Sequence, residues 1–183
     1  MDLSKVAGEI TKILVTEEQI TSKVKELAAE IDSRYVGKDV LLVGVLKGAV
    51  MFMADLSREI QIPVQMDWMA VSSYGSGTQS SGVVRILKDL DADVLGRHVL
   101  IVEDIVDSGL TLSWLSSNLK ARGAASVEVV AFLRKPDAAK VQVDVAMVGF
   151  EIPNEFVVGY GLDYAERYRT LKGVAVLSPA VYS

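Results

Sequence analysis

The stretch VLIVEDIVDSGLT, residues 99–111, carries the densest set of chemically capable side chains in the sequence. An apolar run ends in the adjacent carboxylates Glu103 and Asp104, and a third acid, Asp107, precedes the Ser-Gly-x-Thr run at 108–111. Carboxylates can accept hydrogen bonds from sugar hydroxyls or hold magnesium through oxygen. A loop with small hydroxyl residues at the start of a helix can bind phosphate through hydroxyls and free backbone amides. The stretch therefore indicates a site for a phosphorylated sugar.

Two simpler interpretations of this stretch remain open from the residues alone. Asp107 or Ser108 can be no more than a helix cap, with the acid pair in solvent. Paired acids after a strand also suit an acidic pocket like that of a response regulator, which needs one phosphoacceptor aspartate and no phosphate-binding loop.

The elements that must position these residues follow an alternating pattern of strands and helices. Short apolar runs at 39–46, 98–104, 127–133 and 143–150 are typical of strands buried on both faces of a parallel sheet. Helical spacing is found in the segments 16–38, 48–60 and 110–122. The pattern predicts one α/β domain, residues 1–183, with ligands bound at the carboxyl ends of the strands.

The segments with a weaker strand pattern are expected at the margins of this sheet. Residues 64–74 and 82–90 are predicted strands, and 155–160 is a further candidate. We expect the 64–90 pair and the C-terminal segment to form a small appended lobe. At the start of the first helix, Thr16 and Gln19 have the spacing of a capping box.

Composition narrows the classes of function. The 183-residue chain has a net charge of −5, which argues against a nucleic-acid or anionic-membrane partner. It has no cysteine, and its N-terminus lacks the pattern of a signal peptide. No apolar run reaches the ~18–20 residues that span a bilayer. We expect a cytoplasmic protein.

Residues 99–111 resemble the phosphoribosyl-pyrophosphate (PRPP) signature of type I phosphoribosyltransferases. Further segments resemble hypoxanthine-guanine phosphoribosyltransferases in order and approximate spacing: VLKGA (45–49), SSYGSGT (72–78), VRILKDL (84–90), FLRKP (132–136) and EFVVGYGLDYAERYR (155–169). The resemblance covers nearly the whole chain. It implies a central parallel sheet flanked by helices, a small hood lobe and a flexible active-site loop.

The resemblance also implies a role for each matched residue that contacts PRPP. Glu103 and Asp104 contact the ribose hydroxyls, and Asp107 faces purine N7 as the general base. The implied PRPP- and phosphate-binding residues are Lys47, Gly48, Ser73, Tyr74, Glu103, Asp104, Asp107, Ser108, Gly109, Leu110, Thr111 and Arg169. In this family the Leu46–Lys47 peptide is often cis.

For the purine and the metal, the resemblance points to a second set of residues. Lys135 donates to the 6-oxo group, Ile105 and Phe156 sandwich the ring, and the backbone of Val157 reads the 2-position. Asp163 is assigned to both the purine and the metal subsites. The implied cofactor is Mg²⁺, with Glu103, Asp104 and Asp163 as its protein carboxylates.

The implied reaction joins a 6-oxopurine to the ribose of PRPP, in a homo-oligomer (dimer or tetramer). A closing loop at 72–82, with Ser73 and Tyr74, is expected to exclude water during turnover. Two other functions remain open at this point. One is a non-catalytic regulator that senses PRPP or nucleotides and binds nucleic acid, and the other is an enzyme for another base.

Overall fold

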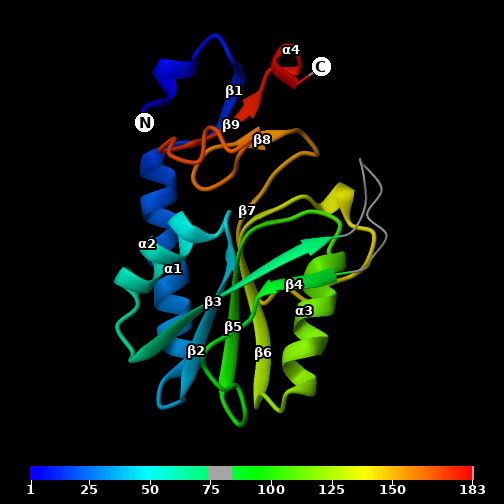
Figure 1. The fold of residues 1–183 in the computed structure, drawn as a ribbon. Helices are drawn as coiled ribbons and strands as arrows, with labels where there is room; N and C mark the ends of the chain where they lie inside the picture. The colour runs from blue at the N-terminus through cyan, green and yellow to red at the C-terminus, as the bar shows by residue number, and fades with distance from the viewer. Residues whose placement is uncertain (74–83, 183) are drawn as a thin grey trace.

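The structure is a computed structural model (Figure 1). It describes residues 1–73 and 84–182, except for the side chain of Ser73. Tyr74 and most of the expected loop at 72–82 lie outside the described residues. The described chain forms a large sheet with helices on both faces and a small sheet at one end. Both chain termini lie at the end with the small sheet (Figure 1).

The large sheet has six strands in the order β4-β3-β2-β5-β6-β7 within the described part of the chain. Their bounds are β2 Val40–Leu46, β3 Val64–Ser73, β4 Val84–Lys88, β5 His98–Val106, β6 Ser126–Arg134 and β7 Met147–Glu151. All neighbouring pairs are parallel except the pair of β3 with the edge strand β4. The predicted α/β fold with a central, mostly parallel sheet is confirmed.

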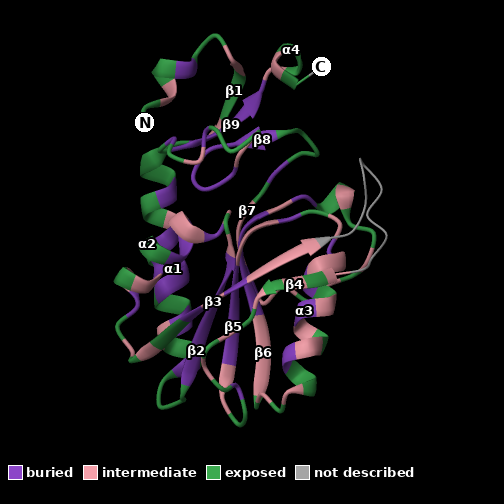
Figure 2. Cartoon of the chain, viewed as in Figure 1, coloured by how far each residue is buried: buried purple, intermediate pink, exposed green. Residues whose placement is uncertain are grey.

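Helices cover both faces because the central strands are apolar on both sides. Leu42 of β2 faces a core shared with α1 (Glu17–Tyr35) and α2 (Val50–Glu59). Its neighbours Leu41 and Val43 face the core under α3 (Leu110–Ala121), since successive strand residues point to opposite faces. Figure 2 shows the buried residues concentrated in the central strands β2 and β5.

The strand order reverses direction between β2 and β5. From β2 the chain passes through α2 to β3 on one side, and from β5 it passes through α3 to β6 on the other. In open α/β sheets such a switch point leaves a crevice at the carboxyl ends of the two strands, where ligands bind. Here those ends carry Lys47 and Gly48 after β2, and Glu103 and Asp104 in β5.

The small sheet joins the two ends of the chain, in the order β1-β9-β8. Strand β1 (Ile10–Val15) pairs antiparallel with β9 (Val174–Leu177), which pairs with β8 (Val157–Val158). An appended lobe was predicted, but its membership was partly wrong. β3 and β4 belong to the large sheet instead, because β3 pairs with β2 from Val64 to Ala70 and with β4 beyond it.

Other element boundaries agree or differ for local reasons. The capping box is present, with Gln19 Oε1 accepting from Thr16 N and Thr16 Oγ1 accepting from Gln19 N. β7 begins at Met147 rather than 143, since Val143 and Val145 pack against the α3 core outside any strand. β8 stops at Val158 because Gly159 and Tyr160 have φ of 102° and 49°.

Short helices complete the described chain: η1 Leu3–Val6, η2 Pro136–Ala138 and α4 Pro179–Tyr182. Among the described residues, no helix has the length and apolar character needed to cross a membrane.

Candidate active site

A cavity of about 470 Å³ lies at the carboxyl ends of the central strands. The β2–α2 loop, the end of β5, the β5–α3 loop and Lys135 after β6 form its floor and sides, and residues 156–169 bring the small lobe over it. The predicted site residues that line it are Lys47, Gly48, Glu103, Asp104, Ile105, Asp107, Ser108, Gly109, Thr111, Lys135, Phe156, Val157, Asp163 and Arg169. The tertiary structure thus brings together residues separated by more than 120 positions in sequence.

The acid pair Glu103 and Asp104 lies partly buried near the end of β5. Oε2 of Glu103 is shielded from solvent and has no hydrogen-bond partner among the described residues. Desolvation and the neighbouring Asp104 carboxylate raise the pKa of Glu103 well above its usual value. Desolvation also raises the pKa of Asp104, although its Oδ1 accepts a 2.9 Å hydrogen bond from Ile105 N. The pair is costly to the free protein, which suggests that it serves a ligand.

We expect Glu103→Gln to raise the melting temperature of the ligand-free protein. A raised pKa means that, at pH values above the ordinary glutamate pKa, the folded protein binds more protons than the unfolded chain. The stability of the wild-type protein therefore falls as the pH rises through the raised pKa. The gain should therefore be larger at pH 8 than at pH 5. Removing the charge from one buried group without a partner should raise the free energy of unfolding by about 1 kcal/mol. This corresponds to a rise in melting temperature of about 2–4 °C. Thermal melts in EDTA at several pH values measure it.

Glu128→Gln is the control for this measurement. Burial opposes the charge of Glu128, but hydrogen bonds from Tyr35 and Arg34 hold the pKa of this carboxyl below its usual value. Its charge therefore stabilises the fold above the ordinary glutamate pKa, and Glu128→Gln should lower the melting temperature at pH 5 and at pH 8. A Glu103→Gln variant that also melts earlier at pH 8 would contradict the costly-pair interpretation.

The β5–α3 loop is built to present free backbone amides. Gly109, with φ of 78°, is the N-cap of α3, and no side chain caps this helix. Ser108 Oγ lies 3.5 Å from Leu110 N, which is too long for a strong hydrogen bond. The N-cap position of α3 is therefore occupied by Gly109, and not by Asp107 or Ser108. The loop is held from outside, because Ser108 O accepts hydrogen bonds from Lys140 N and Val141 N at 3.0 and 3.2 Å.

Asp107 and Lys135 face each other across the cavity as an acceptor and a donor. Asp107 Oδ2 lies 3.6 Å from Lys135 Nζ, and the two side chains are 56% and 9% exposed. Lys135 N also donates to Val106 O at 2.9 Å, which places the end of β6 beside the end of β5. The carboxylate can accept a proton or a hydrogen bond at the same place where the ammonium group donates one.

The β2–α2 loop forms the opposite end of the cavity. The Leu46–Lys47 peptide is cis, and Lys47 Nζ pairs with Glu166 at 3.0 Å on the surface. A Cβ on Gly48 would lie 1.7 Å from Asp104 Oδ2. Only glycine therefore fits beside the acid pair here.

Asp163 and Arg169 are joined at the same end of the cavity. Arg169 Nη2 lies 2.8 Å from Asp163 Oδ1, and Arg169 Nη1 donates to Gly161 O at 2.8 Å. Asp163 Oδ2 accepts from Glu166 N at 2.9 Å. The guanidinium group is thus oriented by fixed partners, as suits recognition of phosphate oxygens.

An aromatic cluster supports the lobe side of the cavity. Phe156 lines the cavity, and its ring packs against Tyr164 and Tyr182, with centroids 5.9 and 5.0 Å away. Ile105 lines the facing wall, and Val157 is held in the β8–β9 pair. Tyr164 and Tyr182 were not predicted as site residues. Aromatic residues near the C-terminal motif were the available signal, but their contact with Phe156 depends on the path of the chain end.

Three predicted residues are not placed in the cavity. Leu110 begins α3 without lining the cavity, Ser73 is described only as the end of β3, and Tyr74 lies outside the described residues. Lining residues that the sequence did not single out are Val45, Leu46, Val71, Val106, Leu112 and Leu162. They are all apolar, and sequence alone does not separate such residues from core.

The donor set fits a magnesium ion that is coordinated mainly by substrate. No group of three potential ligands among His, Cys, Asp and Glu converges within the described residues. Glu103 and Asp104 nevertheless supply carboxylate oxygens, including the unpartnered Oε2, and hard cations take oxygen ligands. Magnesium usually needs only one or two carboxylates when phosphates and water complete its shell.

The fold and the cavity define a domain that binds a phosphorylated sugar at a switch point. Residues 11–165 match the family described as the phosphoribosyl transferase domain, which is this class of protein. The chain is 59% identical over 181 residues to the hypoxanthine-guanine phosphoribosyltransferase of Mycobacterium tuberculosis (strain ATCC 25618 / H37Rv), covering 96% of this chain and 90% of the relative. It is 55% identical over 174 residues to that of Bacillus subtilis, covering 95% and 97%.

A solved structure extends the same comparison to the fold. A hypoxanthine phosphoribosyltransferase from Staphylococcus aureus superposes with a TM-score of 0.94 at 44% identity, covering 97% of each chain. The chain belongs to the hypoxanthine-guanine phosphoribosyltransferase family.

Proposed function

We propose that this protein is a purine salvage enzyme that transfers the phosphoribosyl group of PRPP to N9 of hypoxanthine or guanine. The products are IMP or GMP and pyrophosphate. The observation that carries the proposal is the pair of Asp107 and Lys135, 3.6 Å apart within the cavity. The N7 and O6 atoms of a 6-oxopurine lie on one edge, where a single bidentate side chain can contact both. Asp107 would accept from N7–H while Lys135 donates to O6.

This pair also accounts for selection against other bases. Adenine has an amino group at position 6, which would meet the buried ammonium group of Lys135 and leave donors unpaired. Uracil has no N7 for Asp107. Ile105 and Phe156 would hold the purine plane between them, and the backbone of Val157 would read the 2-position.

The PRPP subsites follow from the remaining contacts. The uncapped amides of α3, with Ser108 and Thr111, would bind the 5′-phosphate. Glu103 and Asp104 would accept hydrogen bonds from the ribose hydroxyls. The backbone at Lys47 and Gly48, together with Arg169, would hold the pyrophosphate.

In the reaction, the bond from C1′ of the ribose to the pyrophosphate oxygen breaks while the bond from N9 forms. Asp107 takes the N7 proton as N9 attacks, which is general base catalysis. Arg169 and the Gly48 amide stabilise the charge that develops on the departing pyrophosphate. Apolar residues around the purine and the lobe above it limit access of water to the sugar cation.

Glu103, Asp104 and Asp163 would be the protein carboxylates near magnesium. When bound, Mg²⁺ neutralises the pyrophosphate charge and orients PRPP. The Asp163–Arg169 pair keeps both groups at the pyrophosphate end.

We expect hypoxanthine or guanine to be converted, and adenine and uracil to be left unchanged. The experiment measures pyrophosphate release from PRPP and Mg²⁺ with each base in turn, with product identified by chromatography. Magnesium removal by EDTA should abolish turnover. Uracil or adenine as the best substrate would overturn the assignment of the base, and no turnover with any base would overturn the enzyme assignment.

The proposed setting is a cytoplasmic homo-oligomer, dimer or tetramer, with small-molecule substrates and neither a nucleic-acid nor a membrane partner. The oligomer rests on the family resemblance. The acidic net charge of −5 supports the absence of a nucleic-acid partner, and the lack of cysteine suits a reducing compartment.

A further inference from the structure

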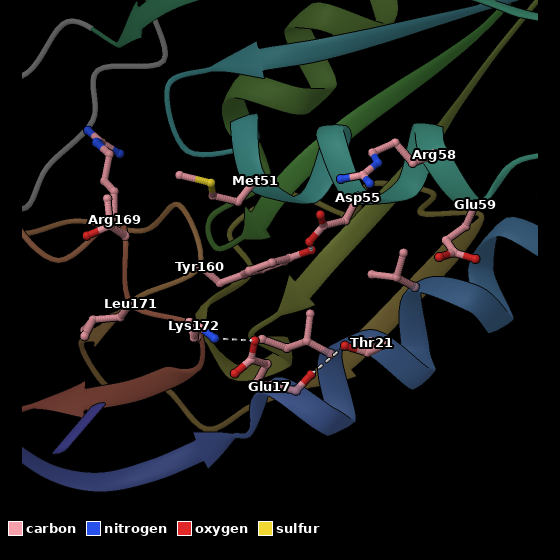
Figure 3. Close-up of a pocket in the computed structure, with 13 residues that line it drawn as sticks. Glu17, Thr21, Met51, Asp55, Arg58, Glu59, Tyr160, Arg169, Leu171 and Lys172 are labelled. Atoms are coloured by element: carbon pink, nitrogen blue, oxygen red, sulfur yellow. Dashed lines mark hydrogen bonds and ion pairs between the residues drawn. The ribbon is translucent and has the colours of Figure 1, made fainter. Parts of the chain in front are cut away.

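A second cavity, of about 520 Å³, lies behind the pyrophosphate end of the active site. It is enclosed by α1, α2 and residues 160–172, and Arg169 lines both cavities. Figure 3 shows the Tyr160 side chain reaching across it with the hydroxyl toward Asp55 of α2. Neither Tyr160 nor Asp55 lines the active site.

Tyr160 is held tightly although its backbone conformation is unfavourable. Its φ of 49° lies in the left-handed region, which costs a non-glycine residue about 1–2 kcal/mol. The ring is buried against Phe132, with centroids 4.8 Å apart, and Tyr160 N donates to Leu171 O at 2.9 Å. The hydroxyl donates to Asp55 Oδ2 at 2.8 Å. Desolvation, followed by the Asp55 interaction, raises the pKa of Tyr160, so this hydroxyl remains a donor throughout the physiological range.

The residue after Tyr160 is pressed against the pyrophosphate loop. A Cβ on Gly161 would lie 2.0 Å from Gly48 O, and a Cβ on Gly48 would lie 1.7 Å from Asp104 Oδ2. The 159–161 turn therefore lies against the backbone carbonyl of Gly48, and Gly48 in turn lies against the Asp104 side chain. A shift of the turn would move Gly48 toward or away from Asp104.

The same turn sets the direction of Arg169. Gly161 N donates to Arg169 O at 2.9 Å, and Arg169 Nη1 donates back to Gly161 O at 2.8 Å. α2 begins directly after the Lys47–Gly48 loop. The hydrogen bond from Tyr160 to Asp55 of α2 therefore fixes the turn relative to this loop, and with it both Gly48 and Arg169 at the pyrophosphate end.

We propose that Tyr160 and Asp55 form a positioning pair that locks the 159–161 turn to α2, and so holds Gly48 and Arg169 in the geometry that binds the pyrophosphate group of PRPP. This inference rests on the proposed function for the identity of the ligand. It assigns no direct substrate contact to either residue. The pair acts through backbone placement, so its loss should appear at the PRPP subsite and not at the purine subsite.

Tyr160→Phe tests the pair, because it removes the hydroxyl and keeps the buried ring. We expect both KM and the calorimetric Kd for PRPP with Mg²⁺ to rise about 5- to 30-fold, which corresponds to about 1–2 kcal/mol of lost binding free energy. The KM for hypoxanthine at saturating PRPP should stay at the wild-type value. The matched control is Tyr35→Phe, since Tyr35 is equally buried and donates to Glu128 Oε2 at 2.7 Å beside the start of β5.

Substitutions of Asp55 test whether a conservative variant keeps the affinity for PRPP, and whether Asp55 and Tyr160 act together. Asp55→Asn keeps an oxygen acceptor and should retain near wild-type PRPP affinity, whereas Asp55→Ala should reproduce the defect of Tyr160→Phe. The double variant Tyr160→Phe/Asp55→Ala should be no worse than either single variant, because the two residues act as one unit.

The outcomes separate this inference from the assignment of function. If Tyr160→Phe and Tyr35→Phe lower the melting temperature alike and PRPP affinity is unchanged in both, the pair is structural only and the inference is overturned. Equal rises in KM for PRPP and for hypoxanthine would also overturn it. A wild-type protein that turns over no base would remove the proposed function, while the PRPP Kd values of the same variants would still decide whether the pair positions the phosphate site.

Discussion

Replacing Asp107 with asparagine is expected to lower kcat by about 10²–10⁴-fold, which is typical for loss of a general base. Asparagine keeps the shape of aspartate but cannot take the N7 proton as N9 attacks. The Asp107 side chain is 56% exposed and pairs with Lys135 Nζ at 3.6 Å, so its carboxylate is accessible to a purine that also reaches Lys135. Since Gly109 and not Asp107 is the N-cap of α3, the substitution should leave the phosphate loop intact.

The measurement is steady-state kcat with hypoxanthine, together with calorimetric binding of PRPP and Mg²⁺. PRPP binding by Asp107→Asn should stay close to wild type. Asp137→Asn is the matched control, because Asp137 is an exposed aspartate two residues after Lys135 and does not line the cavity. A kcat for Asp107→Asn equal to that of this control would remove Asp107 from proton transfer.

The double variant Glu103→Gln/Asp104→Asn is expected to weaken PRPP binding by about 100-fold or more, because each hydrogen bond to a charged group contributes about 1.5–3 kcal/mol. In the proposed function the two carboxylates accept hydrogen bonds from the ribose hydroxyls, and Glu103 Oε2 has no hydrogen-bond partner among the described residues. The rate at subsaturating PRPP should fall with the affinity. This pattern differs from Asp107→Asn, which should lose rate while binding persists.

Titration calorimetry with PRPP, with and without Mg²⁺, measures this loss. The rise in melting temperature that PRPP and Mg²⁺ produce in the wild type should shrink or disappear in the double variant. Without ligand, the double variant should melt at a higher temperature than the wild type. Arg97→Lys, in the surface pair with Asp39, is a suitable charge-retaining control at the opposite end of β5. Wild-type PRPP affinity in the double variant would show that the acids are not the ribose site.

The three sets of variants separate the roles of residues in the active-site cavity and behind it. Asp107 is expected to act on the chemical step, Glu103 and Asp104 on PRPP, and Tyr160 with Asp55 on the pyrophosphate end only. Each set has its own readout, so a defect in one does not imply a defect in another. The stability gain expected for Glu103→Gln measures how much this site destabilises the ligand-free protein. The reason is that burying a carboxylate without a partner costs free energy.

Local signals in the sequence determined most of the large sheet and its helices. Thr16 and Gln19 cap α1 as predicted, because a capping box depends only on residues three apart. β2, β5 and β6 were recognisable as apolar runs, since strands covered by helices on both faces need no polar alternation. The acid pair and the phosphate loop were recognisable because they form one continuous motif.

The small lobe was beyond such local reasoning. β1 and β9 were not predicted, and β1 exposes three of its six residues, so it shows little apolar pattern. Its partner lies more than 150 residues away, and only the antiparallel pairing of β1 with β9, from Ile10 with Leu177 to Val15 with Val174, makes the two segments a sheet. Strand propensity in such cases depends on packing against the partner rather than on the segment itself.

The sequence by itself therefore determined the kinds of groups in the site: four acids, two lysines, one arginine and a loop that leads into a helix. Only the tertiary structure decided their arrangement. It placed Lys135 3.6 Å from Asp107, left Glu103 Oε2 without a partner, and pressed Gly161 onto Gly48 while Tyr160 reached Asp55. The physical reason is that side-chain chemistry is a property of each residue, whereas distances and desolvation depend on which distant segments pack together.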